Sequence, residues 1–183
     1  MLKAILSRII DRFERTWTYD ASYMRHILRA APASFLKFSV ITGLVDRRAA
    51  PAAALAAAGI VGTLLEDCGP CTQISVDMAA AGGVSAPVLC AILAGDDVGM
   101  GEDAALAWQF ARASLARDIE ASDPLREEIV RRWGDRGLVA IALAITTARM
   151  YPTLKYALGY GKACSKIRVA GEDARVVHLP LAA

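Results

Sequence analysis

Apolar residues recur at helical spacing from the start of the chain. Over residues 2–17 the charged side chains lie mostly opposite an apolar stripe made of Leu2, Ile5, Leu6, Ile9, Ile10, Phe13 and Trp17. This spacing predicts an amphipathic helix. Such a helix can lie on a membrane surface, but Asp11 and Glu14 interrupt its positive face. We therefore expect it to dock on the protein core or on a neighbouring subunit.

The pattern continues as a series of helices. Residues 20–45 indicate helix interrupted near Pro32. The segment 49–65 is rich in Ala, Leu and Ile, which favours helix over strand. Further helices are predicted over residues 72–83, 85–93, 102–117, 122–134 and 135–164.

Particular residues predict where these helices begin and end. Gly82 is expected to end the helix that follows residue 72. Asp123 before Pro124 is expected to cap the start of another. Pro152 is expected to kink or break the last helix. Alternating strand patterns are missing except for a short one at residues 174–181, so the chain is predicted to be all-α.

Composition raises the question of a membrane protein, because 55% of the residues are hydrophobic and the mean hydropathy is +0.36. The longest runs without a charge, residues 49–65 and 137–148, fall short of the roughly 20 apolar residues that span a bilayer. No transmembrane segment is therefore expected. Helices this apolar indicate a large or oligomeric core.

The net charge and the charged residues near the N-terminus indicate which binding partners and which cellular location to expect. A net charge of +2 provides no basic stripe for nucleic acid, so no nucleic-acid partner is expected. Charged residues interrupt the N-terminal segment from Lys3 onward, which does not fit a secretory signal. A cytoplasmic location is expected.

The candidate chemistry lies in the sequence Cys-Gly-Pro-Cys at residues 68–71. Two cysteines at this spacing can form a disulfide when the backbone makes a helical turn. Pro70 suits the first turn of a helix, where backbone amides lower a thiol pKa, whereas the nearby Glu66 and Asp67 act in the opposite direction. An Ala-rich helix precedes the motif in place of the β-strand of a thioredoxin. Redox use is favoured over mere packing.

The remaining cysteines and the histidines provide little further chemistry. Cys90 and Cys164 are single residues in apolar segments and are expected to serve packing. His26 and His178 are far from the motif in sequence, so a four-ligand zinc site would need distant segments. No metal or cofactor is expected, and a metal-binding module is kept as a third hypothesis.

The order of elements around the motif resembles the alkylhydroperoxidase D-like and carboxymuconolactone decarboxylase superfamily. The features that carry this resemblance are the Ala-rich helix, the CxxC heading the next helix, "FARASLAR", and "WGDRGLVAIALAITTARMYPTLKYALG". It covers residues 44–162. The resemblance implies one all-helical domain over 1–183, with N-terminal helices at 1–43, the family core at 44–162 and a tail at 163–183. It also implies a homo-oligomer, trimeric or hexameric, with the CxxC in a pocket near a subunit interface.

The resemblance further implies how the two cysteines work. Cys71 would attack a hydroperoxide, Cys68 would resolve the resulting sulfenic acid as a disulfide, and a dithiol reductant would restore both thiols. The family's relay is missing, because Ser75 stands where its pattern has a histidine four residues after the second cysteine. Pro70 stands in place of another histidine and Ala56 in place of a glutamate.

Two nearby residues are candidates to replace that relay. The Ser75 hydroxyl lies one helical turn from Cys71 and could hydrogen-bond a thiolate, although a hydroxyl is a poor base. Glu66 could exchange a proton with Cys68 if burial raised its pKa. The sequence thus predicts an antioxidant thiol-disulfide oxidoreductase acting on a hydroperoxide or disulfide substrate through Cys68, Cys71, Glu66 and Ser75. The alternatives are a redox-sensing helical oligomer without catalysis and, with less support, a lactone decarboxylase.

Overall fold

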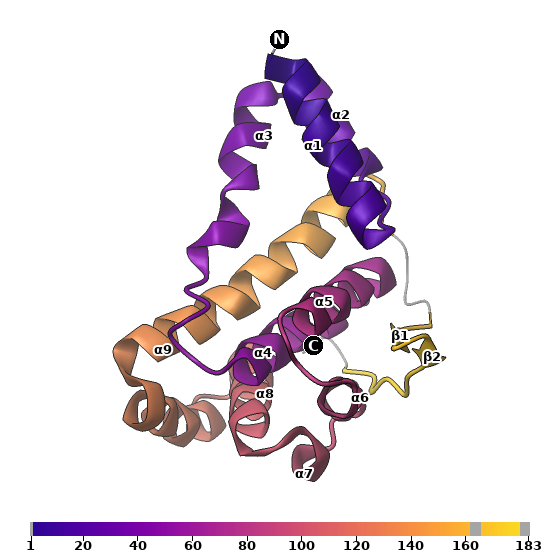
Figure 1. Cartoon of the computed structure of the whole chain (residues 1–183). Coiled ribbons are helices and arrows are strands. Elements are labelled where there is room, and N and C mark those ends of the chain that lie inside the picture. The colour runs from indigo at the N-terminus through magenta and orange to yellow at the C-terminus, as the bar shows by residue number, and fades with distance from the viewer. Residues whose placement is uncertain (1, 162–165, 180–183) are drawn as a thin grey trace.

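The computed structural model describes residues 2–161 and 166–179, and it is mostly helical (Figure 1). This confirms the all-α class. The elements are α1 (Leu2–Trp17), α2 (Ser22–Ala30), α3 (Pro32–Ser39), η1 (Ile41–Leu44), α4 (Ala52–Leu65), α5 (Gly69–Ala81), α6 (Ala86–Ala94), α7 (Asp97–Met100), α8 (Glu102–Leu115), α9 (Ile119–Ala157), β1 (Arg168–Val169) and β2 (Glu172–Asp173).

The N-terminal helices form a small cluster of their own. Figure 1 shows α1 and α2 side by side at that end of the molecule, with α3 leading from them toward the rest of the chain. Their buried side chains, here called the N-terminal cluster, are Leu6, Ile10, Tyr19, Ala21, Tyr23, Leu28 and Phe35. Ile74 of α5 and Tyr151 of α9 pack against this cluster. As predicted, the helix is interrupted near Pro32, which becomes the first residue of α3.

The main core is built around α4, which packs against α8 and α9. Small residues allow a close approach: a Cβ at Gly62 would lie 3.0 Å from the backbone oxygen of Ile145. Gly59 faces Ala144 and Ala148 at 4.0 Å. Later residues of α4 meet later residues of α9: Gly59 faces Ala144, and Gly62 faces Arg149. The helix α4 and the second half of α9 therefore run in the same direction.

Helix α9 corrects two expectations about its boundaries. Its N-cap is Asp118, whose carboxylate accepts a hydrogen bond from the Ala121 amide at 3.0 Å. The expected cap at Asp123 is therefore wrong, because the helix has already begun five residues earlier. The helix also continues through Pro152, where a break was expected. Its interruption at Gly134 (φ 67°) lies at the predicted boundary between residues 122–134 and 135–164. Glycine adopts positive φ without steric cost, which makes it the easier place to bend.

The end of the described chain forms a short hairpin. β1 pairs antiparallel with β2, whereas residues 174–179 are not strand, so the strand expected at 174–181 is misplaced over its described part. The Val177 amide donates a hydrogen bond to the Leu93 carbonyl at 2.8 Å, which ties this segment to α6. Cys164 lies outside the described residues.

Among the described helices, α9 contains one stretch long and apolar enough to cross a bilayer. Within that stretch 39% of the residues are buried against the rest of the chain. Core helices of globular proteins meet the same criterion, so the expectation of no transmembrane segment stays a prediction.

Candidate functional site

Cys68 and Cys71 form a disulfide at the start of α5, with their Cα atoms 5.3 Å apart. Cys68 is the N-cap residue and Cys71 lies in the first turn. Neither residue is open to bulk solvent, since Cys68 is 0% and Cys71 3% exposed. The free N–H groups of this turn favour a thiolate at Cys71 once the disulfide is reduced.

The turn before the disulfide is held by hydrogen bonds. Asp67 adopts a positive φ of 46°, and its amide donates to the Leu64 carbonyl at 3.1 Å. The Tyr156 hydroxyl of α9 donates to the Asp67 carbonyl at 3.0 Å. This turn reverses the chain between α4 and α5 and places Cys68 against the core.

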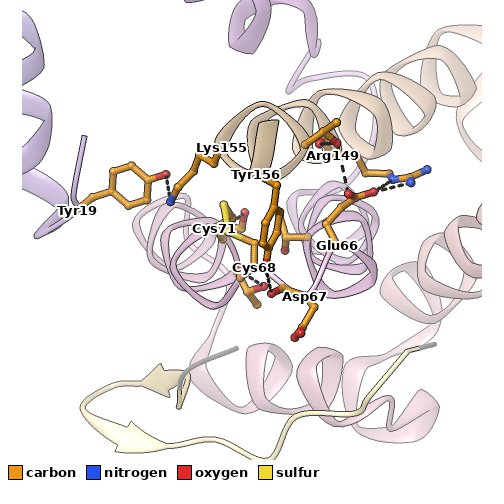
Figure 2. The surroundings of a disulfide bond; sticks show 12 residues. Tyr19, Glu66, Asp67, Cys68, Cys71, Arg149, Lys155 and Tyr156 are labelled. Carbon is orange, nitrogen blue, oxygen red and sulfur yellow. Dashed lines mark hydrogen bonds and ion pairs between the residues drawn. A yellow bond between two sulfur atoms is a disulfide. The ribbon is translucent and has the colours of Figure 1, made fainter. Parts of the chain in front are cut away.

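Glu66 is anchored to α9 across this turn (Figure 2). Arg149 Nε donates to Glu66 Oε1 at 2.6 Å. The Thr153 hydroxyl donates to the Arg149 carbonyl at 2.8 Å and lies 3.3 Å from Glu66 Oε2. The Glu66 side chain is only 14% exposed. Its carboxylate is thus occupied by partners other than Cys68 in the oxidised state.

Ser75 and Asp77 lie on different sides of α5. The Ser75 hydroxyl donates to the backbone carbonyl of Cys71 at 2.9 Å, so its proton points along the helix. Asp77 accepts a hydrogen bond from Gln73 at 2.8 Å, on the side where Gln73 also contacts the Arg168 backbone. Only Ser75 shares a cavity with Cys71.

That cavity has a volume of about 500 Å³ and lies between the N-terminal helices and the helices α4, α5 and α9. On α5 its lining begins at Cys71. The other lining residues of this helix follow at helical spacing; they are Ile74, Ser75, Met78, Ala79 and, just beyond the helix, Gly82. Cys68 is not among the lining residues. Of the two cysteines, Cys71 is thus the one that borders the cavity.

The serine and threonine hydroxyls of the cavity lining are all engaged within their own helices. The hydroxyls of four lining residues each donate to a carbonyl of their own helix; these residues are Ser39, Thr63, Ser75 and Thr147. Their protons are thus not directed at a ligand. None of the described lining residues is a histidine, aspartate or glutamate, and the one charged residue among them is Arg47.

Tyr19 and Tyr23 line the cavity from the N-terminal cluster and pack around the buried Lys155. Lys155 Nζ donates to the Tyr19 hydroxyl at 3.2 Å and lies 4.9 Å from the Tyr19 ring centroid, as Figure 2 shows for the hydrogen bond. Burial raises the pKa of Tyr19 to about 12 and raises that of Tyr23 as well. Both hydroxyls are therefore protonated at neutral pH and cannot act as bases.

The other cysteines and possible metal ligands lie elsewhere. Cys90 is exposed on α6, so the expectation that it serves core packing is wrong. Within residues 2–161 and 166–179, no three His, Cys, Asp or Glu side chains form a cluster that could hold a metal ion. His26 contacts the Tyr160 hydroxyl at 3.2 Å, away from the disulfide.

No protein-family model, no curated protein and no solved structure matches this chain. The superfamily resemblance and the oligomer it implies accordingly stay predictions.

Sequence reasoning missed the contribution of α9 to the site. Arg149, Thr153 and Tyr156 follow one another at spacings of four and three, so they lie along one face of the helix. Polar residues at this spacing in an apolar helix are a signal that could have been found. Their partners Glu66 and Asp67 are more than eighty residues away, which no local pattern indicates.

Proposed function

We propose that the protein is a thiol-disulfide oxidoreductase that cycles Cys68 and Cys71 between dithiol and disulfide and reduces hydroperoxides. The observation that carries this proposal is the pair itself: the two cysteines are bonded to each other, and one of them faces a cavity large enough for an organic substrate. Cavities of about 300–1,000 Å³ are typical of small-molecule sites.

The cavity supports different roles for the two cysteines. Cys71 lines it, and in this proposal its sulfur is the one that a bound hydroperoxide meets. Its thiolate attacks the terminal oxygen, the O–O bond breaks, and the alcohol leaves with a proton, so that Cys71 becomes a sulfenic acid. The Cys68 sulfur then attacks Sγ of Cys71 and water leaves, which forms the disulfide.

A dithiol reductant completes the cycle by two exchange steps and is itself oxidised to a disulfide. One hydroperoxide and one dithiol are thus converted into an alcohol, a water molecule and a disulfide. Because the described cavity lining contains no histidine or carboxylate, the helix-terminal amides are the groups that favour the Cys71 thiolate. Glu66 and Ser75 stay the candidates for handling its proton.

The absence of a histidine or carboxylate from the described cavity lining also favours a second function, redox sensing. A protein whose thiols oxidise once and are not recycled would act as a redox sensor. Steady-state turnover separates the two functions, because an enzyme consumes many equivalents of hydroperoxide when dithiothreitol is present and a sensor stops after one.

The experiment follows loss of cumene hydroperoxide with excess dithiothreitol. We expect Cys71→Ser to abolish turnover. In a parallel reaction without dithiothreitol, Cys68→Ser should be oxidised once and stay at the sulfenic acid, whereas the wild type should form the disulfide. The matched control is the Cys90→Ser, Cys164→Ser double variant, which keeps the proposed pair and should retain full activity. Full activity in Cys71→Ser would overturn the proposal.

A further inference from the structure

Arg47 and Cys71 lie toward opposite ends of the apolar cavity. Along α4 the lining residues run from Ala52 to Thr63, which at 1.5 Å per residue is about 16 Å. Arg47 precedes the first of these residues in the chain, and Cys71 follows the last. The Arg47 guanidinium and the Cys71 sulfur are thus placed toward opposite ends of the apolar face that α4 turns to the cavity.

Two ion pairs to α9 support this arrangement independently. Asp46, next to Arg47, accepts a hydrogen bond from Arg136 at 2.7 Å. Glu66, close to the disulfide, pairs with Arg149. The thirteen positions between these two arginines correspond to about 20 Å of helix. The loop that carries Arg47 is therefore held near one end of this stretch and the disulfide near the other.

Arg47 is available to a ligand. It is exposed, and among the described residues it has no ion pair or side-chain hydrogen bond. Its nearest acidic neighbour in sequence, Asp46, is already engaged by Arg136 and by the Arg48 amide. An exposed guanidinium beside an apolar cavity favours a molecule with one anionic end and an apolar body.

We propose that the cavity binds a long-chain carboxylate, with its carboxylate at Arg47 and its hydrocarbon chain extending along α4 toward Cys71. The serine and threonine hydroxyls of the lining are used within their own helices, so the mainly apolar lining disfavours polar ligands, which would lose hydrogen bonds to water with little replacement. The carboxylate stays at the exposed end, where it keeps its hydration and gains a charged partner.

This inference deepens the proposed function, on which its catalytic part rests, by naming the substrate class. A hydroperoxide group carried far along such a chain would lie near Cys71, whereas a small peroxide would gain no binding from the cavity. Binding of the chain itself does not require the redox reaction, so the two ideas can be tested apart.

The test is calorimetric titration of the oxidised protein with dodecanoate and with 1-dodecanol, both below their aggregation limits. We expect both to bind, dodecanoate more tightly. Arg47→Gln should weaken the binding of dodecanoate about fivefold, as loss of an exposed ion pair implies, and leave the binding of dodecanol unchanged.

Two further variants test the position of the site. Ala56→Phe, which fills the cavity from α4, should abolish binding of both ligands. Ala142→Phe, an exposed position of α9 outside the cavity, is the size-matched control and should bind normally.

The outcomes distinguish failure of the proposed carboxylate-binding site from failure of the proposed redox reaction. Binding by a Cys68→Ser, Cys71→Ser variant, together with no turnover of any hydroperoxide by the wild type, would support the site and overturn the proposed function. Rapid turnover without dodecanoate binding would overturn the site alone. Equal weakening of dodecanoate and dodecanol by Arg47→Gln would overturn the orientation that we propose.

Discussion

Arg149 of α9 donates a hydrogen bond to Glu66 at 2.6 Å, two residues before the first cysteine of the disulfide. The pair joins the turn that carries the redox motif to the longest helix of the protein. Tyr156 adds a second connection one residue further along, at the Asp67 carbonyl. The disulfide is therefore positioned by α9 as well as by the helices on either side of it.

The first prediction concerns the role of Glu66. Because its carboxylate is held by Arg149, we expect Glu66→Gln to lower the free energy of unfolding by about 1 kcal/mol. Loss of a general base would slow Cys71 oxidation by about 10²-fold or more, whereas loss of an anchor should change it little. Stopped-flow oxidation and urea unfolding of Glu66→Gln, Arg149→Met and the double variant measure both effects. A large rate loss confined to Glu66→Gln would assign it a role in proton transfer.

The second prediction compares two glycines of α4. Alanine at either position gains helix propensity of about 1 kcal/mol. A Cβ at Gly59 has its nearest neighbours at 4.0 Å, whereas at Gly62 it would lie 3.0 Å from the Ile145 backbone oxygen. We expect Gly59→Ala to stabilise the protein and Gly62→Ala to destabilise it. Equal unfolding free energies for the two variants would contradict the close packing of α4 on α9.

The third prediction concerns acid and the N-terminal helices. Glu14 accepts hydrogen bonds from Arg25 and from the Ala21 amide. The Arg25 hydrogen bond, the largest effect, lowers the pKa of Glu14 below its ordinary value of 4.5. A lowered pKa in the folded state means that the stabilisation is complete above pH 4.5 and is lost as the pH falls through the lowered value.

Thermal unfolding of Glu14→Gln tests this dependence. At pH 7 we expect the variant to be less stable than the wild type by about 1 kcal/mol, and the difference should shrink progressively as the pH falls below 4.5. Glu127→Gln is the control, since Glu127 is exposed on α9 and has no ion pair among the described residues. A Glu14→Gln difference that stayed constant down to strong acid would show that the pair does not stabilise the fold.

The sequence predicted the helices well where the signals were local. The apolar stripe of residues 2–17, the interruption near Pro32 and Gly82 after α5 all lie where expected. The failures came where tertiary packing overrides a local preference. Pro152 is buried and stays within α9, so the break expected there is missing. The interruption at Gly134 does fall at the predicted boundary between residues 122–134 and 135–164.

The site was predictable only in part. The spacing of Cys68 and Cys71 and the proline between them predicted a disulfide at a helix start. The resemblance implied a pocket at the CxxC near a subunit interface. The walls of the observed cavity could not be predicted, because they come from helices that are separated by most of the chain, including the N-terminal cluster. Helical spacing correctly predicted that Ser75 lies on the same side of α5 as Cys71. It could not predict that the Ser75 hydroxyl donates its proton to a backbone carbonyl.

The central claim is that Cys68 and Cys71 form a working redox pair that a hydroperoxide reaches through Cys71. The measurement is mass spectrometry of the fully reduced protein over time after one equivalent of cumene hydroperoxide, followed by addition of dithiothreitol. We expect a loss of two hydrogens mapped to Cys68 and Cys71, much faster than any oxidation of the exposed Cys90 in the same molecule, and full reversal by the dithiol. Oxidation of the pair no faster than that of Cys90 would contradict the claim.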